Sequence, residues 1–109
     1  MGAKRSLTPG ERLSAAVLGE FELLEHELVL LEEAARTLDL CASLQAVVDA
    51  DGPLMPTRAG VRAHPAAVEL RQQRITLARL LAVLRIPWGE EGEGARVQRR
   101  AVRGVYGVA

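Results

Sequence analysis

Residues 24–51 read LEHELVLLEEAARTLDLCASLQAVVDAD, and this stretch decides the fold. Its apolar residues recur alternately four and three positions apart, the spacing that places side chains on one face of an α-helix. We predict a helix over about 21–49, roughly 40 Å long, which is longer than the core of a small domain requires. The members of this stripe are Leu24, Leu28, Leu31, Ala35 and Leu38.

A second apolar set in the same segment does not fit on that stripe. It consists of Leu23, Leu30, Leu40, Leu44 and Val47. A helix that is apolar on two sides needs two partners to cover it. We expect one partner to be another helix of the same chain and the other to be a second subunit.

The segment 68–87, VELRQQRITLARLLAVLRIP, predicts a second long helix. Proline is tolerated in the first turn of a helix but not in its interior, so we expect this helix to start at His64-Pro65 and to end near Arg85, before Pro87. It also carries two apolar lines. One consists of Leu70, Leu77 and Leu84, with Leu80 and Leu81 on the same side, and the other of Val68, Ile75 and Ala82.

The linker between these helices is short, so the helices are predicted to run antiparallel as a helical hairpin. Asp51-Gly52-Pro53 ends the first of them. The pieces 54–55 and 60–62 are compatible with a short, irregular β-hairpin, in which Pro56 disfavours a central strand. The predicted fold class is therefore all-α, with at most a small β-hairpin in the connection.

The two ends of the chain differ from this core. Thr8 as N-cap, Pro9 in the first turn and Glu11 near the helix dipole predict a short helix over about 8–18, which Gly19 would end. The tail is rich in glycine and arginine, and we expect it to become ordered only on a partner. The predicted organisation is a basic lead and short helix at 1–20, a helical-hairpin oligomerisation core at 21–88, and a flexible tail at 89–109.

Charge is unevenly distributed although the formal net charge is zero. Residues 1–50 carry nine acidic and four basic side chains, whereas residues 51–109 carry five acidic and ten basic ones. The basic half could meet phosphate. The basic strip of the second long helix, Arg71, Arg74, Arg79 and Arg85, has three interpretations: a solvated or salt-bridged face, an ion-pairing surface between subunits, or a phosphate contact.

Signals of catalysis, metal binding and membrane insertion are missing from the sequence. It contains no Gly-rich phosphate loop, and the adjacent Glu32 and Glu33 point about 100° apart on a helix, so they do not converge on one substrate. A single cysteine, Cys41, excludes an intrachain disulfide and a thiolate zinc cluster, and His26 and His64 have no ligand companion at zinc spacing. We expect a cytoplasmic non-enzyme with no metal, cofactor or membrane contact.

Three stretches together resemble a known family. They are the first long helix, the connection from Gly60 to His64-Pro65 with the helix that follows, and the ending QRRAVRGVYGV at 98–108. This pattern of helix, turn and helix is similar to the P27-like family of phage terminase small subunits. The likeness covers most of the chain from about residue 20, without a single diagnostic motif.

The resemblance implies a component of a phage genome-packaging motor in the host cytoplasm. Such subunits form rings through helical hairpins, bind viral double-stranded DNA at the packaging site, and recruit the large subunit that supplies the ATPase and nuclease. A ring of roughly 8–10 subunits is the corresponding expectation. The candidate oligomerisation residues are Leu24, Leu28, Leu31, Leu38, Leu70, Leu77 and Leu84.

The resemblance also assigns roles to the cations. The candidate DNA contacts are Lys4, Arg5, Arg12, Arg71, Arg74, Arg79 and Arg85, and the candidate contacts to the large subunit are Arg99, Arg100, Arg103 and Tyr106. About 20 residues precede the long helix, too few for the separate helix-turn-helix domain of many terminase small subunits. DNA contact would then come from the ring surface, the short helix or the arms. The alternative is a helical protein-interaction or antitoxin-like module without DNA binding.

Overall fold

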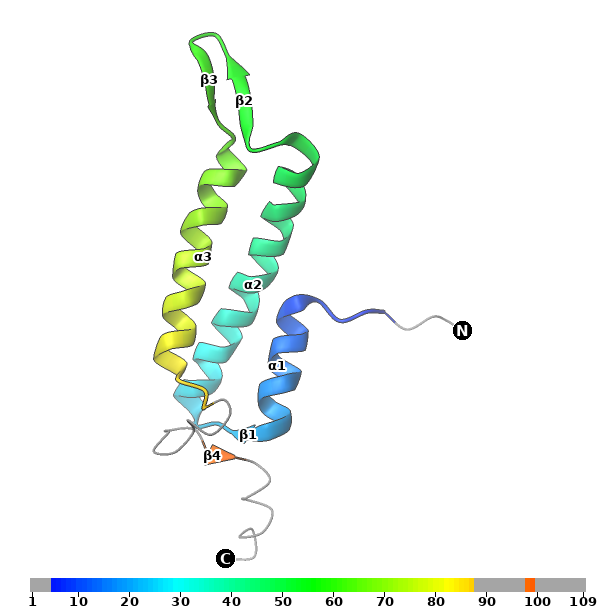
Figure 1. The fold of residues 1–109 in the computed structure, drawn as a ribbon. Coiled ribbons are helices and arrows are strands. Elements are labelled where there is room, and N and C mark those ends of the chain that lie inside the picture. Colours follow the sequence, from blue (N-terminus) through cyan, green and yellow to red (C-terminus); the bar gives the residue numbers. More distant parts are fainter. Residues whose placement is uncertain (1–4, 88–97, 100–109) are drawn as a thin grey trace, which may run out of the picture.

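The computed structural model describes residues 5–87 and the two residues 98–99, and within them the protein is mostly helical (Figure 1). Three helices follow in chain order: α1 at Pro9–Glu20, α2 at Glu25–Asp51 and α3 at Pro65–Leu84. The long helices α2 and α3 lie side by side and antiparallel, and α1 packs beside the N-terminal part of α2. The prediction of an all-α chain with a short helix and a helical hairpin is confirmed.

Four short strands complete the described fold. Strands β2 (Leu54–Thr57) and β3 (Gly60–Ala63) form an antiparallel ribbon between α2 and α3, which confirms the small β-hairpin predicted there. Strand β1 (Phe21–Glu22) pairs antiparallel with β4 (Gln98–Arg99). The described piece of the tail, β4, is thus held against its own chain by backbone pairing, while the expectation that the tail becomes ordered on a partner stays a prediction.

Local signals set both ends of α2. The predicted start at about 21 is wrong, because Phe21 and Glu22 are extended and the helix begins at Glu25. Its first turn is capped from within, since the Leu24 backbone N–H donates to Glu27 Oε1 over 2.7 Å. At the other end Gly52 adopts a φ of 84°, a left-handed value that favours glycine, and the helix stops at Asp51 as predicted.

The start of α3 depends on His64, the residue at which the sequence predicted that the helix begins. The ring Nδ1 accepts the Ala66 backbone N–H at 3.0 Å, and Nε2 lies 2.9 Å from Asp51 Oδ2. Since Nδ1 is an acceptor, Nε2 carries the proton and donates to Asp51. The His64 backbone N–H donates to the Pro53 carbonyl at 2.8 Å. These bonds close the base of the β2–β3 ribbon and fix where α3 leaves it.

Helix α1 is anchored to α2 through its first turn. Thr8 Oγ1 accepts the Glu11 N–H at 3.0 Å and the Glu11 carboxylate accepts the Thr8 N–H at 2.9 Å, a reciprocal capping box. Asp39 of α2 accepts the Gly10 N–H at 2.8 Å and the Thr8 hydroxyl at 3.0 Å. Pro9 has no N–H, so every donor of this turn is satisfied. The helix continues through Gly19 to Glu20, beyond the predicted stop.

The core sits where α1, the N-terminal half of α2 and the end of α3 meet. Val17, Phe21, Leu31 and Leu84 are its fully buried members. Burial of Val17 and Phe21 on either side of Gly19 explains why α1 does not end at that glycine. Farther along the hairpin, Ala34, Cys41 and Leu70 are also buried. Cys41 is a free cysteine.

The two glycines of α1 give a matched test of this packing. A Cβ at Gly10 would overlap the Ala35 carbonyl oxygen and lie 2.7 Å from Asp39 Oδ2, whereas a Cβ at Gly19 would meet no atom within 4 Å. We expect Gly10→Ala to lower the free energy of unfolding by about 1–3 kcal/mol, because the helices must separate. Gly19→Ala should raise it by about 0.5–1 kcal/mol. Urea unfolding measures both, and equal effects at the two sites would contradict the close approach.

Candidate nucleic-acid interface

The four arginines predicted on the second long helix are all exposed on α3. Among residues 5–87, no carboxylate pairs with Arg71, Arg74, Arg79 or Arg85. Arg74 instead reaches across the hairpin, where its Nη2 donates to Gln45 Oε1 of α2 over 2.6 Å. An internal salt bridge to the acidic helix is therefore not what positions these arginines, and their charge faces solvent.

Two of these arginines share a groove on the seam between α2 and α3. The groove has a volume of about 550 Å³ and is lined by Arg71 and Arg74 together with apolar side chains of both helices. The Arg74–Gln45 bond holds one guanidinium at its edge. A shallow apolar floor with two cations and no carboxylate in its lining suits an anionic partner that also presents flat apolar groups.

The other two arginines are not brought to this groove. At about 100° per residue, Arg79 points about 80° away from Arg71 and about 140° away from Arg74. Arg85 adopts a left-handed φ of 58° just beyond α3 and lines a separate groove with His26 and Glu27. It lies about 21 Å along the helix axis from Arg71. The predicted strip of four arginines is thus one pair and two separate residues.

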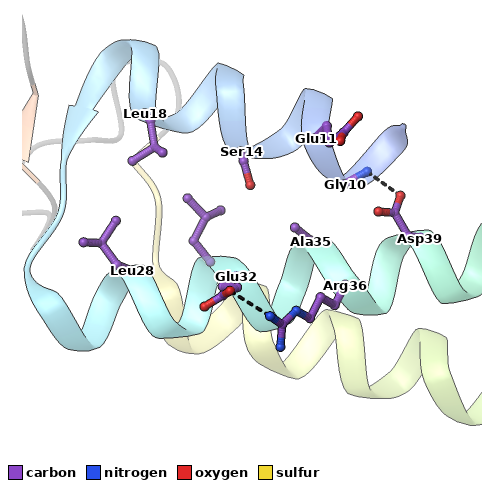
Figure 2. A pocket seen from close by; sticks show the side chains of 10 residues that line it. Gly10, Glu11, Ser14, Leu18, Leu28, Glu32, Ala35, Arg36 and Asp39 are labelled. Carbon is purple, nitrogen blue, oxygen red and sulfur yellow. Dashed lines mark hydrogen bonds and ion pairs between the residues drawn. The ribbon is translucent and has the colours of Figure 1, made fainter. Parts of the chain in front are cut away.

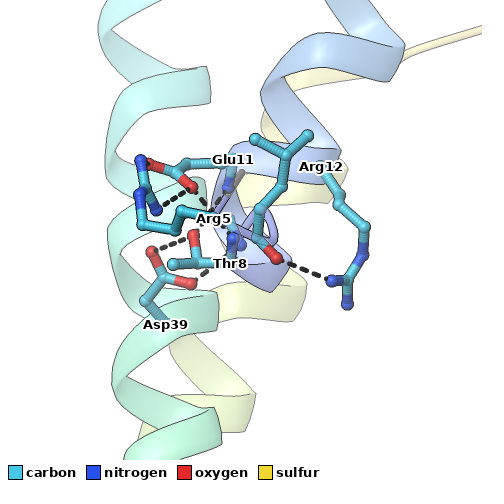
Figure 3. Close-up of polar contacts among 7 residues, drawn as sticks. Arg5, Thr8, Glu11, Arg12 and Asp39 are labelled. Atoms are coloured by element: carbon cyan, nitrogen blue, oxygen red, sulfur yellow. Dashed lines mark hydrogen bonds and ion pairs between the residues drawn. The ribbon is translucent and has the colours of Figure 1, made fainter. Parts of the chain in front are cut away.

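Arg5, before α1, and Arg12, in its first turn, are engaged locally (Figure 3). Arg5 forms a two-pronged contact with the Glu11 carboxylate at 2.9 and 3.1 Å, and Arg12 Nη1 donates to the Leu7 carbonyl at 2.9 Å. Arg5 is therefore neutralised by its partner, which makes it a weak candidate for phosphate. Lys4 lies outside the described residues.

The contact with Arg5 changes the acidity of Glu11. The hydrogen bond from the Arg5 guanidinium, and then that from the Thr8 backbone N–H, lower the pKa of Glu11 from 4.5 to about 2. The same carboxylate raises the pKa of Arg5. Both groups stay charged at neutral pH, so the first turn of α1 keeps its capping box and its link to Asp39.

This shift predicts an acid-dependent loss of stability. A carboxylate whose pKa is lower in the folded state stabilises the fold above its unfolded pKa, and that contribution disappears as the pH falls towards its folded pKa. We expect the stability difference between the native protein and Glu11→Gln to be complete above pH 4.5 and to shrink steadily towards pH 2. Urea unfolding of both proteins over this range checks it. A difference that does not vary with pH would show that Glu11 acts only through its shape.

A groove between α1 and α2 offers a contrast with the arginine groove (Figure 2). Its volume is about 500 Å³, and Leu18 and Leu28 form part of its apolar lining. Its cation is already engaged, because Arg36 contacts Glu32 at 2.9 Å and Glu33 at 3.6 Å. The cation of this groove thus has carboxylate partners already, unlike Arg71 and Arg74.

The seven leucines predicted for oligomerisation divide into three groups. Leu31, Leu70 and Leu84 are buried inside the protomer, so their assignment to a subunit interface is corrected: contact with a second subunit would require the core to open. Leu38 and Leu77 are partly buried and line a small groove beside Cys41. Only Leu24 and Leu28 are exposed, at 63% and 37%.

Other apolar residues of the long helices are exposed, and some of them belong to the second apolar sets that the sequence analysis predicted for these helices. On α2, Val29, Leu40 and Val47 are exposed, and at about 100° per residue they fall within an arc of about 20°. On α3, Val68, Ile75 and Ala82 are exposed along one line, roughly opposite the buried Leu70 and Leu84. We call these sets the α2 line and the α3 line. The predicted second line of α3 is exposed as a whole. On α2 the prediction holds only for Leu40 and Val47, because Leu23 and Leu30 of the predicted set pack against the core.

The candidate contacts in the tail are only partly within the described range. Arg99 belongs to β4, whose backbone pairs with Phe21 of β1. Arg100, Arg103 and Tyr106 lie outside the described residues. Because β1 joins α1 to α2, β4 is attached at the end of the hairpin opposite the β2–β3 ribbon (Figure 1).

Two exposed arginines of the ribbon were missed by the sequence interpretation. Arg58 lies in the turn between β2 and β3, and Arg62 lies in β3. The signal was available, because no aspartate or glutamate occurs from Gly52 to Val68. The arginines of α3 follow a helical spacing, whereas Arg58 and Arg62 lie in a short irregular connection that has no such periodicity.

The described residues form neither a metal-ligand cluster nor a membrane-spanning helix. In that part of the chain, no three or more histidine, cysteine, aspartate or glutamate side chains gather as metal ligands would. None of the helices there combines the length and the apolar run of a membrane span. Compared with protein families, with curated proteins and with solved structures, the chain has no match. Its own geometry therefore carries the functional argument.

Proposed function

We propose that this protein is a non-catalytic DNA-packaging adaptor, the small subunit of a phage terminase. It would assemble into a ring, bind viral double-stranded DNA in the host cytoplasm, and recruit the large ATPase-nuclease subunit. The observation that carries the proposal is the outward surface of α3, where an exposed apolar line runs beside arginines that have no carboxylate partner among residues 5–87. The apolar line suits contact with another protomer, and the arginines suit contact with phosphate.

Self-assembly is supported by the two exposed apolar lines. Soluble monomers rarely leave extended apolar surfaces uncovered, and such surfaces usually mark an interface. The α2 line and the α3 line differ in sequence and lie on different helices of the hairpin. A ring requires two dissimilar surfaces that meet head to tail, whereas a two-fold dimer needs only one. Two unlike apolar surfaces on one protomer therefore favour a ring.

DNA binding is supported by the arginine pair. Arg71 and Arg74 line a common groove, are exposed, and have no carboxylate beside them in the groove. Arginine binds phosphate oxygens through two parallel hydrogen bonds and releases counterions from the duplex when it does so. Contacts of this kind supply affinity and orientation rather than sequence preference.

The apolar lines give a test of assembly. We expect Ile75→Asp, in the α3 line, to reduce the mass of the particle to that of a protomer while the helical content is kept, because the new charge lies on an already exposed surface. Leu31→Asp should unfold the protein instead, since it buries an unpaired charge in the core. Light scattering and circular dichroism measure the two results. An unchanged mass for Ile75→Asp would place the interface elsewhere.

The arginine pair gives a test of DNA binding. We expect the double variant Arg71→Ala/Arg74→Ala to bind duplex DNA roughly tenfold more weakly, and the slope of log affinity against log salt to fall by about 2 if each arginine contacts one phosphate. Arg36→Ala is the control, because Arg36 is paired with Glu32 and Glu33. Fluorescence anisotropy at graded salt measures both.

Two results would overturn parts of this proposal. Loss of the oligomer in the double variant would place Arg71 and Arg74 between subunits. An intact native oligomer without salt-sensitive DNA affinity would favour a helical protein-interaction or antitoxin-like module.

A further inference from the structure

The β2–β3 ribbon extends beyond the ends of α2 and α3 and packs on neither helix along its length (Figure 1). All of its residues except the half-buried Met55 are exposed, with 60% of Leu54 and 70% of Val61 open to solvent. An isolated two-stranded ribbon is only marginally stable in water. This ribbon is held at its base by His64, which bonds to Asp51 and Pro53, and at its tip by the Thr57 hydroxyl, which donates to the Gly60 carbonyl at 2.7 Å.

The ribbon marks the positive end of a charge gradient along the hairpin. The segment 52–68 contains Arg58 and Arg62 and no carboxylate. Arg71 and Arg74 lie in the first half of α3, next to the ribbon. Three carboxylates, Asp49, Asp51 and Glu69, also lie near the ribbon. The other eight within residues 5–87 lie in α1, β1 and the first part of α2: Glu11, Glu20, Glu22, Glu25, Glu27, Glu32, Glu33 and Asp39.

The two faces of the ribbon carry different chemistry. Leu54 pairs with Ala63 and Pro56 with Val61, so one face is wholly apolar. Met55 pairs with Arg62 on the other face. Arg58 occupies the turn at the tip, and neither arginine has a carboxylate partner among residues 5–87. The ribbon therefore presents exposed cations at its tip and on one face.

We propose that the β2–β3 ribbon enters the major groove of duplex DNA, with Arg58 and Arg62 at the base edges and Arg71 near the flanking phosphates. This inference rests on the proposed DNA-binding function and names the element that performs it. The major groove is about 12 Å wide and about 8.5 Å deep, and it admits a two-stranded ribbon. Four residues per strand span roughly 13 Å, which is enough to reach the groove floor.

The chemistry of both faces fits that groove. Arginine donates two hydrogen bonds to O6 and N7 of guanine, which are exposed in the major groove. The apolar face of Val61 and Pro56 suits the thymine methyl group, which lies in the same groove. The rigid base matters because a ribbon already ordered loses less conformational entropy on binding than a disordered arm would.

A second copy of this chain is a less suitable occupant. The groove nearest the ribbon is lined by Arg71 and Arg74, so it would repel Arg58 and Arg62 of a neighbouring protomer. At the acidic end of the hairpin, three of the carboxylates are already paired: Glu11 with Arg5, and Glu32 and Glu33 with Arg36. The polyanionic duplex offers unpaired negative charge at every phosphate.

The test uses the full chain and a mixed-sequence DNA duplex, with dimethyl sulfate as a probe of guanine N7 in the major groove. We expect the native protein to protect specific guanines. Arg58→Ala/Arg62→Ala should lose this protection and bind roughly tenfold to a hundredfold more weakly. Arg58→Lys/Arg62→Lys should recover much of the affinity through its charge but not the guanine protection, because lysine lacks the planar two-pronged donor.

A control variant and three further outcomes distinguish a failure of the ribbon assignment from a failure of the proposed DNA-binding function. Arg36→Ala, at the acidic end, should behave as the native protein in every assay. If the native protein binds duplex DNA and the alanine double variant binds and protects it equally, the ribbon assignment is wrong while the DNA-binding function stands. A change of oligomeric mass in that variant would make the ribbon a subunit contact and overturn the inference. If the native protein shows no salt-sensitive DNA affinity, the proposed function itself fails.

Discussion

The junction where α2, the ribbon and α3 meet determines the rest of the arrangement. One residue, His64, caps α3 through Nδ1, binds Asp51 at the end of α2 through Nε2, and holds Pro53 through its backbone N–H. An aspartate at a helix C-terminus is unfavourable beside the helix dipole, so Asp51 gains from a donor at this point. The bonds fix the angle at which the chain returns. They therefore set which faces of α2 and α3 meet, and they hold the ribbon away from both.

Because α2 and α3 run antiparallel, the uneven distribution of charge along the sequence becomes an uneven distribution of charge along the hairpin. The carboxylates concentrate in the first part of α2 and the cations in the connection and the first half of α3. Had the two helices run parallel, these charges would lie side by side and pair across the hairpin. Because the helices run antiparallel, they lie towards opposite ends. Arg74 accordingly finds Gln45 rather than a carboxylate opposite it, and the cations remain open to a partner outside the protomer.

The sequence predicted the helices and the β-hairpin well. It predicted poorly which surface each apolar helix face contacts. Local chemistry defines Thr8 as a cap, Gly52 as a stop and Pro65 as a start, so these were found. The leucines repeated every seven residues also predicted correctly that α2 and α3 pack against each other. Spacing alone does not say whether a leucine meets its own chain or another copy, and the structure buries Leu31, Leu70 and Leu84 within the protomer. The contact of Asp39 with Gly10 and the pairing of β4 with β1 join residues far apart in the chain. No local pattern encodes either contact.

If the proposed function is correct, the length of the hairpin separates DNA binding at the ribbon from contact with the large subunit at the β4 end. The ribbon lies at one end of α2, and β1 with the attached β4 lies at the other. A helix of 27 residues spans roughly 40 Å. A tail that leaves from β4 therefore starts far from DNA held at the ribbon, and one protomer could contact the duplex and the large subunit at once without competition between them. The stiffness of the two packed helices, whose facing leucines are buried, keeps that separation constant. The apolar lines on their outer sides remain available for the neighbouring protomers of a ring.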